Sequence, residues 1–265
     1  MSELVLGAVA YDAKVVPIWD GFKAYFESHG LPFDFVLYSN YERQVAAHLR
    51  GELDVAWNSP LAWFQTQRAA PDRAQAIAMR DTDRDLTSVV LVRATPGPGG
   101  PGASAPVQTA ADLRVVGVGA RDSPQATLIP LLALADAGAR VEVVHHDVLV
   151  GKHGDHVGGE RDAVKALLAG KVDAACVIDG NRLAFAREGL FAPDQLRVVL
   201  QTAPYDHCNV TALADTPAIA RLRELLLAMS YDDPVVRPLL DMEGLTRWLP
   251  GRISGYALLE RAVDA

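Results

Sequence analysis

Short apolar runs alternate with segments of helical periodicity along most of the chain. Between residues 4 and 69, the runs Leu4–Ala10, Phe33–Ser39 and Asp54–Asn58 are each followed by a stretch whose apolar residues recur at helical spacing. A repeated strand–helix order requires parallel strands with helices packed on the faces of the sheet. The sequence therefore predicts an α/β protein.

A stretch rich in proline and glycine, Thr95–Pro106, separates this first α/β block from a second one. Neither a helix nor a central strand accommodates such a composition. We therefore predict a first lobe of residues 1–94 plus 207–265, a second lobe of residues 105–200, and crossovers near 95–104 and 201–206. Two lobes joined by two crossings predict a hinged fold with central mixed sheets and a ligand cleft between the lobes.

Composition and charge exclude several classes of protein. The formal net charge is −8, and no basic stripe typical of nucleic-acid binding is visible. No apolar run reaches the ~18 residues that span a bilayer, so we expect no membrane insertion. The start, Met1-Ser2-Glu3, lacks the features of a secretory signal. We expect a cytoplasmic protein as the sequence stands, or a periplasmic or extracellular one if a leader was removed.

Polar residues follow two of the predicted strands and are candidates for ligand binding. Tyr11 comes after the first strand, whereas Asn58 and Ser59 close the third and precede Pro60. Ligands of open α/β sheets bind at the carboxyl ends of the strands, and helix starts attract anions. Asn58 and Ser59 are also good helix caps, and the sequence leaves both roles open.

Asp179 and His207 are further candidates. Asp179 ends a buried strand, where it would suit an amino or hydroxyl group of a ligand or cap a helix. His207 follows the second predicted crossover and precedes Cys208. Neighbours in a strand point to opposite faces, so we expect no hydrogen bond between His207 and Cys208 and no catalytic cysteine.

A histidine-rich segment gives weak candidates for a metal site, His153 and His156. The segment is rich in glycine, so a loop that contacts ligand or is simply solvated explains it as well. No nucleotide-binding or serine-hydrolase motif occurs. We therefore expect no metal and no cofactor.

Four pieces of the sequence, in order along the chain, resemble one known family. The pieces are LRGELDVAWNSPLAW (49–63), LIP (128–130), DAVKALLAGKVDAA (162–175) and EGLTRWLP (243–250). They resemble the phosphate/phosphite/phosphonate substrate-binding proteins of ABC transporters. The resemblance implies the type II periplasmic-binding-protein fold, a small anionic ligand and the membrane subunits of an ABC transporter as partners.

The same resemblance points to three more ligand-binding residues and to two departures from the family. Family members hold the anion on a turn of Ser and Thr just before the Leu-Ile-Pro helix. Here Ser123 remains, and Gln125 stands at a hydroxyl position. A Ser-His pair of the family is replaced by Glu160 and Arg161, and Arg161 suits a carboxylate or phosphate. These changes imply a pocket altered for something other than simple phosphonate.

The sequence favours a solute-binding protein that closes over a small polar or anionic ligand, either phosphonate-like or a carboxylate. Two alternatives remain open: a cytoplasmic enzyme on the same fold that acts on a small metabolite, and a ligand sensor. Consumption of a ligand would distinguish an enzyme from a binding protein.

Overall fold

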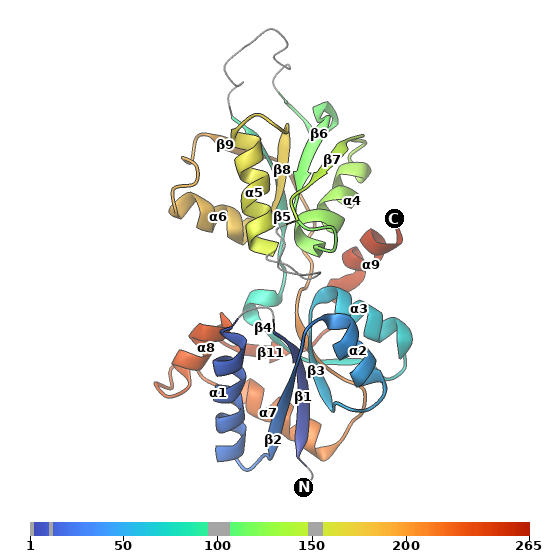
Figure 1. Cartoon of the computed structure of the whole chain (residues 1–265), viewed down its shortest axis with the longest axis vertical. Helices are drawn as coiled ribbons and strands as arrows, with labels where there is room; N and C mark the ends of the chain where they lie inside the picture. Colours follow the sequence, from blue (N-terminus) through green and yellow to red (C-terminus); the bar gives the residue numbers. More distant parts are fainter. Residues whose placement is uncertain (1–2, 11–12, 95–106, 148–155) are drawn as a thin grey trace. The chain divides into compact units, whose positions relative to one another are not determined.

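The computed structural model of the chain describes residues 3–10, 13–94, 107–147 and 156–265, with the backbone alone at residues 156 and 157. The chain forms two compact units (Figure 1). Unit 1 consists of Met1–Asp85 and Asp206–Tyr256, and unit 2 of Leu86–Tyr205 and Ala257–Ala265. No helix among the described residues is both long and apolar enough to cross a membrane.

Unit 1 is built on a mixed sheet with the strand order β11-β4-β10-β3-β1-β2. The strands β1, β2 and β3 are parallel, as the strand–helix alternation predicts, whereas β10 runs antiparallel to both β3 and β4. The carboxyl ends of β1–β3 therefore share one edge of the sheet. The strands are β1 (Leu4–Val9), β2 (Phe33–Tyr38), β3 (Val55–Asn58), β4 (Gln75–Arg80), β10 (Asn209–Ala212) and β11 (Trp248–Pro250).

Helices cover both faces of this sheet (Figure 1). The apolar residues of α1 recur at helical spacing and are buried in a core shared with α7 and α8. On the other face, α2 and α3 pack against β1, β3 and β10. The helices are α1 (Val15–Ser28), α2 (Tyr41–Leu49), α3 (Pro60–Ala69), α7 (Pro217–Ala228) and α8 (Arg237–Glu243), with 3₁₀ turns at Asp81–Asp83 and Ser254–Tyr256.

The buried side chain of His48 on α2 makes the stability of unit 1 depend on pH. Burial lowers its pKa from 6.5 to about 4. Between these values the unfolded chain binds a proton that the folded chain does not. The free energy of unfolding therefore falls by about 2–3 kcal/mol as the pH drops from about 7 to about 4.5. Urea unfolding of the His48→Gln variant should lose this part of the pH dependence.

His29, which is exposed at the end of α1, provides the matched control. The His29→Gln variant should keep the pH dependence of the unaltered protein. An equally steep loss of stability in His48→Gln would show that His48 is not its source.

Unit 2 contains a second mixed sheet, with the order β7-β6-β8-β5-β9. The strand β6 is parallel to β7 and β8, whereas β5 is antiparallel to β8 and β9. Side chains of β5 alternate between two cores, because successive residues of a strand point to opposite faces. The strands are β5 (Ser88–Arg93), β6 (Val115–Val118), β7 (Glu142–His145), β8 (Ala174–Ile178) and β9 (Leu196–Gln201).

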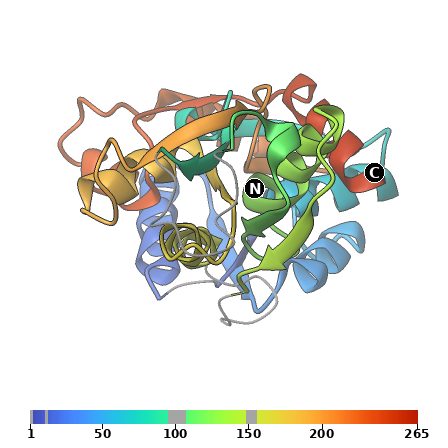
Figure 2. The ribbon, with the colours of Figure 1, turned by 90° about the horizontal axis from the view of Figure 1, so that it is seen from above.

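One face of the second sheet packs against α5 and α6, and the other against α4. The final helix, α9, lies beside α4 (Figures 1 and 2). Arg261 of α9 also forms an ion pair with Asp136 of α4, at 3.0 Å. The helices are α4 (Ile129–Asp136), α5 (His156–Leu168), α6 (Asp179–Arg187) and α9 (Ala257–Asp264), with a 3₁₀ turn at Ala110–Asp112 and a π-helical turn at Pro124–Leu128.

The boundaries of the units differ from those predicted. Residues 86–94 belong to unit 2, not to the first lobe, because β5 is hydrogen-bonded between β8 and β9. Residues 257–265 also belong to unit 2, because α9 buries Leu259 and Ala262 there. The chain passes between the units after Asp85, Tyr205 and Tyr256. The predicted crossover near 95–104 lies outside the described residues.

Candidate functional site

Ser59 is the N-cap of α3 and lies at the edge of the sheet where the parallel strands of unit 1 end. Its Oγ accepts a hydrogen bond from the backbone amide of Ala62, at 3.3 Å, and Pro60 occupies the first helical position. The N-terminus of a helix carries partial positive charge and amide donors, which suit an anion. The capping role that the sequence suggested for Ser59 is therefore present. Ser59 is half-buried, and its contact with a ligand stays a prediction.

Asn58, next to Ser59, is fully buried in a polar network. Its Oδ1 accepts a hydrogen bond from Gln44 Nε2, at 2.9 Å, and its Nδ2 donates to Thr211 Oγ1, at 2.8 Å. These bonds join α2, β3 and β10. Asn58 therefore positions the sheet edge in this structure, and its predicted contact with a ligand stays untested.

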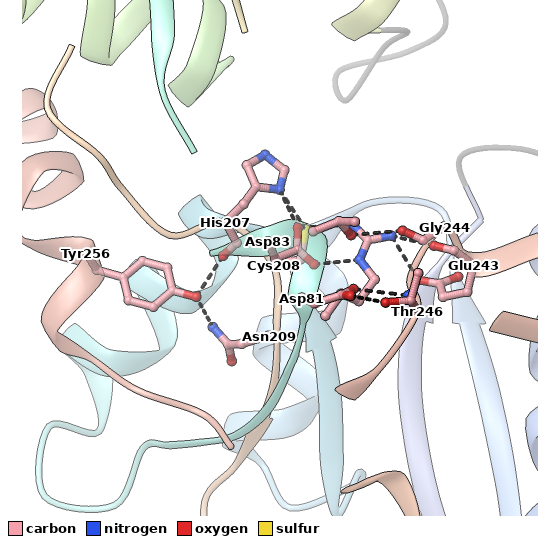
Figure 3. Close-up of polar contacts among 11 residues, drawn as sticks. Asp81, Asp83, His207, Cys208, Asn209, Glu243, Gly244, Thr246 and Tyr256 are labelled. Carbon is pink, nitrogen blue, oxygen red and sulfur yellow. Dashed lines mark hydrogen bonds and ion pairs between the residues drawn. The ribbon is translucent and has the colours of Figure 1, made fainter. Parts of the chain in front are cut away.

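The network continues to the backbone of His207 (Figure 3). Thr211 Oγ1 donates to Asn209 Oδ1, at 2.6 Å, and Asn209 Nδ2 donates to the hydroxyl oxygen of Tyr256, at 2.8 Å. That hydroxyl in turn donates to the carbonyl oxygen of His207, at 2.7 Å. The buried polar side chains thus hold the segment that precedes β10.

His207 lies in a cluster with Asp83 and Cys208, and their side chains point toward one another (Figure 3). The Nδ1 atom of His207 is 3.1 Å from Cys208 Sγ and 3.3 Å from Asp83 Oδ1. The prediction that His207 and Cys208 form no hydrogen bond with each other was wrong. It assumed a strand, but β10 begins only at Asn209, so the alternation of a strand does not apply.

The geometry of this cluster is not that of a nucleophile–histidine–carboxylate triad. Such a triad uses both ring nitrogens, one toward the nucleophile and one toward the carboxylate. Here Nδ1 faces both Cys208 and Asp83. The arrangement therefore gives no support to proton relay from Cys208.

Arg80 anchors the carboxylate side of the cluster. Its guanidinium donates to both carboxylate oxygens of Asp83, at 2.5 and 3.0 Å, and to Glu243 Oε1, at 3.2 Å. Burial opposes ionisation of Asp83, but Arg80 and His207 outweigh it and lower its pKa to about 2. Burial raises the pKa of Glu243 to about 7 despite Arg80. Burial disfavours the charged form of His207, but Cys208 and Asp83 raise its pKa to about 10.

In unit 2, Ser123 performs the same local task as Ser59. It follows β6 and caps the π-helical turn, with its Oγ accepting from the amide of Ala126, at 3.2 Å. Gln125 is nearly buried, and its backbone carbonyl oxygen accepts a hydrogen bond from Ser88 Oγ, at 2.5 Å. Ser88 is in turn 2.6 Å from the Tyr205 hydroxyl. Contacts of Ser123 and Gln125 with a ligand stay predictions.

Two charged residues predicted to bind ligand have protein partners in unit 2. Arg161 forms an ion pair with Glu188, at 2.6 Å, and its guanidinium lies 4.4 Å from the centre of the Phe185 ring. Asp179 accepts a hydrogen bond from Arg182 Nε, at 2.7 Å, within the first turn of α6. A ligand that binds to either residue competes with these partners.

Glu160 has a structural role that its place in the sequence did not reveal. It is fully buried, and its Oε2 accepts hydrogen bonds from the amide of Ile178 and from Asn181 Nδ2, both at 3.0 Å. It thereby joins α5 to the carboxyl end of β8. Of the other predicted residues, Tyr11, His153 and the side chain of His156 lie outside the described residues.

The predicted site residues are divided between the two units. Unit 1 contains one group, at the sheet edge, and unit 2 contains the other. The polar network links Asn58 to the backbone of His207, and Ser59 follows Asn58 in the chain. The first group is Asn58, Ser59 and His207, and the second is Ser123, Gln125, Arg161 and Asp179.

The fold matches several solved structures. PhnD1 from Prochlorococcus marinus, in complex with methylphosphonate, has a TM-score of 0.67 and 17% identity, covering 98% of this chain and 97% of that one. XAC2383 from Xanthomonas citri, bound to ATP, has a TM-score of 0.71 and 16% identity, covering 100% and 99%. The aliphatic sulphonate binding protein SsuA from Escherichia coli has a TM-score of 0.57 and 17% identity, covering 100% and 86%.

These similarities establish the α/β fold of type II periplasmic binding proteins. The comparison with curated proteins gives no match. A family model, described as ABC transporter, phosphonate, periplasmic substrate-binding protein, matches residues 8–256. The match includes the four sequence pieces on which the resemblance rests. The chain therefore belongs to the family of periplasmic phosphonate substrate-binding proteins of ABC transporters.

Proposed function

We propose that this protein is the substrate-binding component of an ABC transporter and takes up a small anion of the phosphonate, phosphate or carboxylate class. The observation that carries the proposal is the family match over residues 8–256. In the proposed role the protein works in the periplasm and delivers its ligand to the membrane subunits of the transporter.

The capped helix starts supply chemistry that suits such a ligand. Ser59 and Ser123 each follow the carboxyl end of a parallel strand and begin a helical segment. Their hydroxyls and the neighbouring amides donate hydrogen bonds to an anion, and the helix dipole favours its charge. Hydroxyls, backbone amides and a helix dipole can bind an anion without a lysine or arginine side chain. We propose Ser59 and Ser123 as ligand contacts.

Titration calorimetry against methylphosphonate, phosphate, phosphite, a short alkyl sulfonate and a short carboxylate tests the proposal. We expect at least one of these anions to bind and to raise the melting temperature. The Ser59→Ala variant should weaken that binding about 5- to 30-fold, the equivalent of about 1–2 kcal/mol for one lost hydrogen bond. The ligand should be recovered unchanged.

Thr216 is the matched control for the loss of a helix cap. Its Oγ1 accepts a hydrogen bond from the amide of Ile219, at 3.3 Å, the same length as that at Ser59. It follows β10, which runs antiparallel to β3, so it lies at the opposite edge of the sheet from Ser59. Thr216→Ala should cost about 1 kcal/mol of stability and leave affinity unchanged.

Three outcomes would contradict these proposals. If no anion of the panel binds, the proposed ligand class is wrong. Conversion of a bound anion into product would favour the alternative of an enzyme. Equal losses of affinity in Ser59→Ala and Thr216→Ala would mean that Ser59 acts only as a helix cap.

A further inference from the structure

Three side chains of the kinds that bind transition metals meet at one point in unit 1. Asp83 comes from the 3₁₀ turn after β4, and His207 and Cys208 from the segment before β10. One ligand atom from each residue lies within 4.8 Å of the other two. The backbone supports the meeting, because the amide of His207 donates to the carbonyl oxygen of Asp83, at 2.8 Å.

The separations of these atoms approach those between the ligands of a tetrahedral zinc ion. Bond lengths of about 2.3 Å to sulfur and about 2.0–2.1 Å to nitrogen and oxygen place neighbouring ligand atoms about 3.4–3.6 Å apart. Cys208 Sγ and Asp83 Oδ1 are 3.1 and 3.3 Å from His207 Nδ1. Sγ and the carboxylate oxygen lie within 4.8 Å of each other, and rotation of the two side chains would bring them to the spacing that one ion requires. The Nδ1 atom of His207 faces both Cys208 and Asp83. This arrangement does not suit proton transfer between the two residues, but it suits a metal ion that all three side chains share.

Charge and burial also suit a divalent cation. The side chain of Asp83 is 2% exposed and Cys208 is 8% exposed, so few water molecules compete for the metal. A thiolate and a carboxylate together balance a charge of +2. The neighbouring positive charge of Arg80 pairs with Asp83, at 2.5 Å, and with Glu243, at 3.2 Å. A ligand set of sulfur, imidazole nitrogen and carboxylate oxygen selects Zn²⁺ and similar ions over Mg²⁺ or Ca²⁺.

We propose that Asp83, His207 and Cys208 form a binding site for a thiophilic divalent metal ion such as Zn²⁺. Three protein ligands leave one position of a tetrahedral ion to water or to an anion. The site differs from the weak candidates His153 and His156, which come from another part of the chain. The proposal does not depend on which anion the protein transports.

Titration of the full chain, without an affinity tag, with Co²⁺ and then Zn²⁺ tests this site. Cobalt bound to a thiolate gives a sulfur-to-metal charge-transfer band, and tetrahedral cobalt gives visible absorption bands. We expect both, at one ion per chain, and their loss when Zn²⁺ displaces Co²⁺. A metal held only by histidines gives no charge-transfer band, so the His153 segment cannot produce the same result.

Cys176 provides the matched control, because it is the other cysteine of the chain and lies buried in β8. The charge-transfer band should persist in Cys176→Ser and vanish in Cys208→Ser. Loss of a residue that only hydrogen-bonds to a metal ligand costs roughly 10- to 100-fold in metal affinity. Because Cys208 itself would hold the ion, Cys208→Ser should lower the affinity for Zn²⁺ by more than this. Circular dichroism confirms that each variant is folded.

A measurement on the unaltered protein guards against a variant that does not fold. Zn²⁺ should protect Cys208 from alkylation by iodoacetamide, as read by peptide mass spectrometry. Absence of the charge-transfer band in the folded protein would overturn the proposal. So would an equal band in Cys208→Ser, or metal binding that leaves alkylation of Cys208 unchanged.

Discussion

Replacement of Arg80 by methionine should lower the free energy of unfolding of unit 1 by about 3–5 kcal/mol, because it removes the arginine that two buried carboxylates share. Arg80 donates to both oxygens of Asp83 and to Glu243 Oε1, and both carboxylates are nearly buried. Its guanidinium also lies 5.2 Å from the centre of the Trp57 ring. Urea unfolding followed by tryptophan fluorescence measures the effect.

Arg50 is the matched control for loss of an arginine–carboxylate pair. It donates to both oxygens of Glu52, at 2.6 and 2.9 Å, but the two side chains are 59% and 54% exposed. Water replaces the lost contacts there, so Arg50→Met should cost less than about 1 kcal/mol. If Arg80→Met and Arg50→Met lower the free energy of unfolding equally, burial does not determine how much an arginine–carboxylate pair stabilises unit 1.

The second large effect is expected at Gly251, where the chain leaves β11. A Cβ atom at this position would lie 1.8 Å from the carbonyl oxygen of Ala76 and 2.8 Å from the amide nitrogen of Ile77. Both are backbone atoms of β4, so no side-chain rotation relieves the clash. Gly251→Ala should therefore cost about 3 kcal/mol or more, which urea unfolding measures.

Gly180, within α6, is the control for the effect of alanine itself. A Cβ atom there meets nothing within 4 Å. Because glycine is a poor helix former, Gly180→Ala should stabilise unit 2 by about 0.5–1 kcal/mol. A neutral effect of Gly251→Ala would mean that β11 can move away from β4 at little cost.

Local periodicity was enough to predict most of the elements. The run Leu4–Ala10 corresponds to β1, and the helical spacing of apolar residues from Val15 onward corresponds to α1. Ser59, singled out as a good helix cap, is the N-cap of α3, which begins at Pro60. These features depend on residues that are close together in the sequence, so the sequence alone predicts them.

The boundaries of the units depend on distant partners and could not be predicted in the same way. The sequence placed β5 with β4, from which it is separated by a short polar turn. Its hydrogen-bonded neighbours are β8 and β9, which lie far along the chain. Likewise, the apolar face of α9 does not reveal that its partner is α4 rather than a helix of unit 1.

The candidate site was predicted in part for the same reason. The capping role of Ser59 was predicted because a cap after a strand is a local pattern, whereas Ser123 was singled out only by the resemblance to the family. The role of Asp83 was missed, because its turn looked like an ordinary polar connection between strands. Its spacing of three residues from Arg80 was the only local sign of their ion pair. The contact between His207 and Cys208 depends on where β10 begins, and strand ends are hard to place from sequence.

The assignment of α9 to unit 2 has a practical consequence for fluorescence labelling of the two units. Residue 3 lies in unit 1 and residue 265 in unit 2. A donor dye near one terminus and an acceptor dye near the other would therefore label one unit each, without labels inside either sheet.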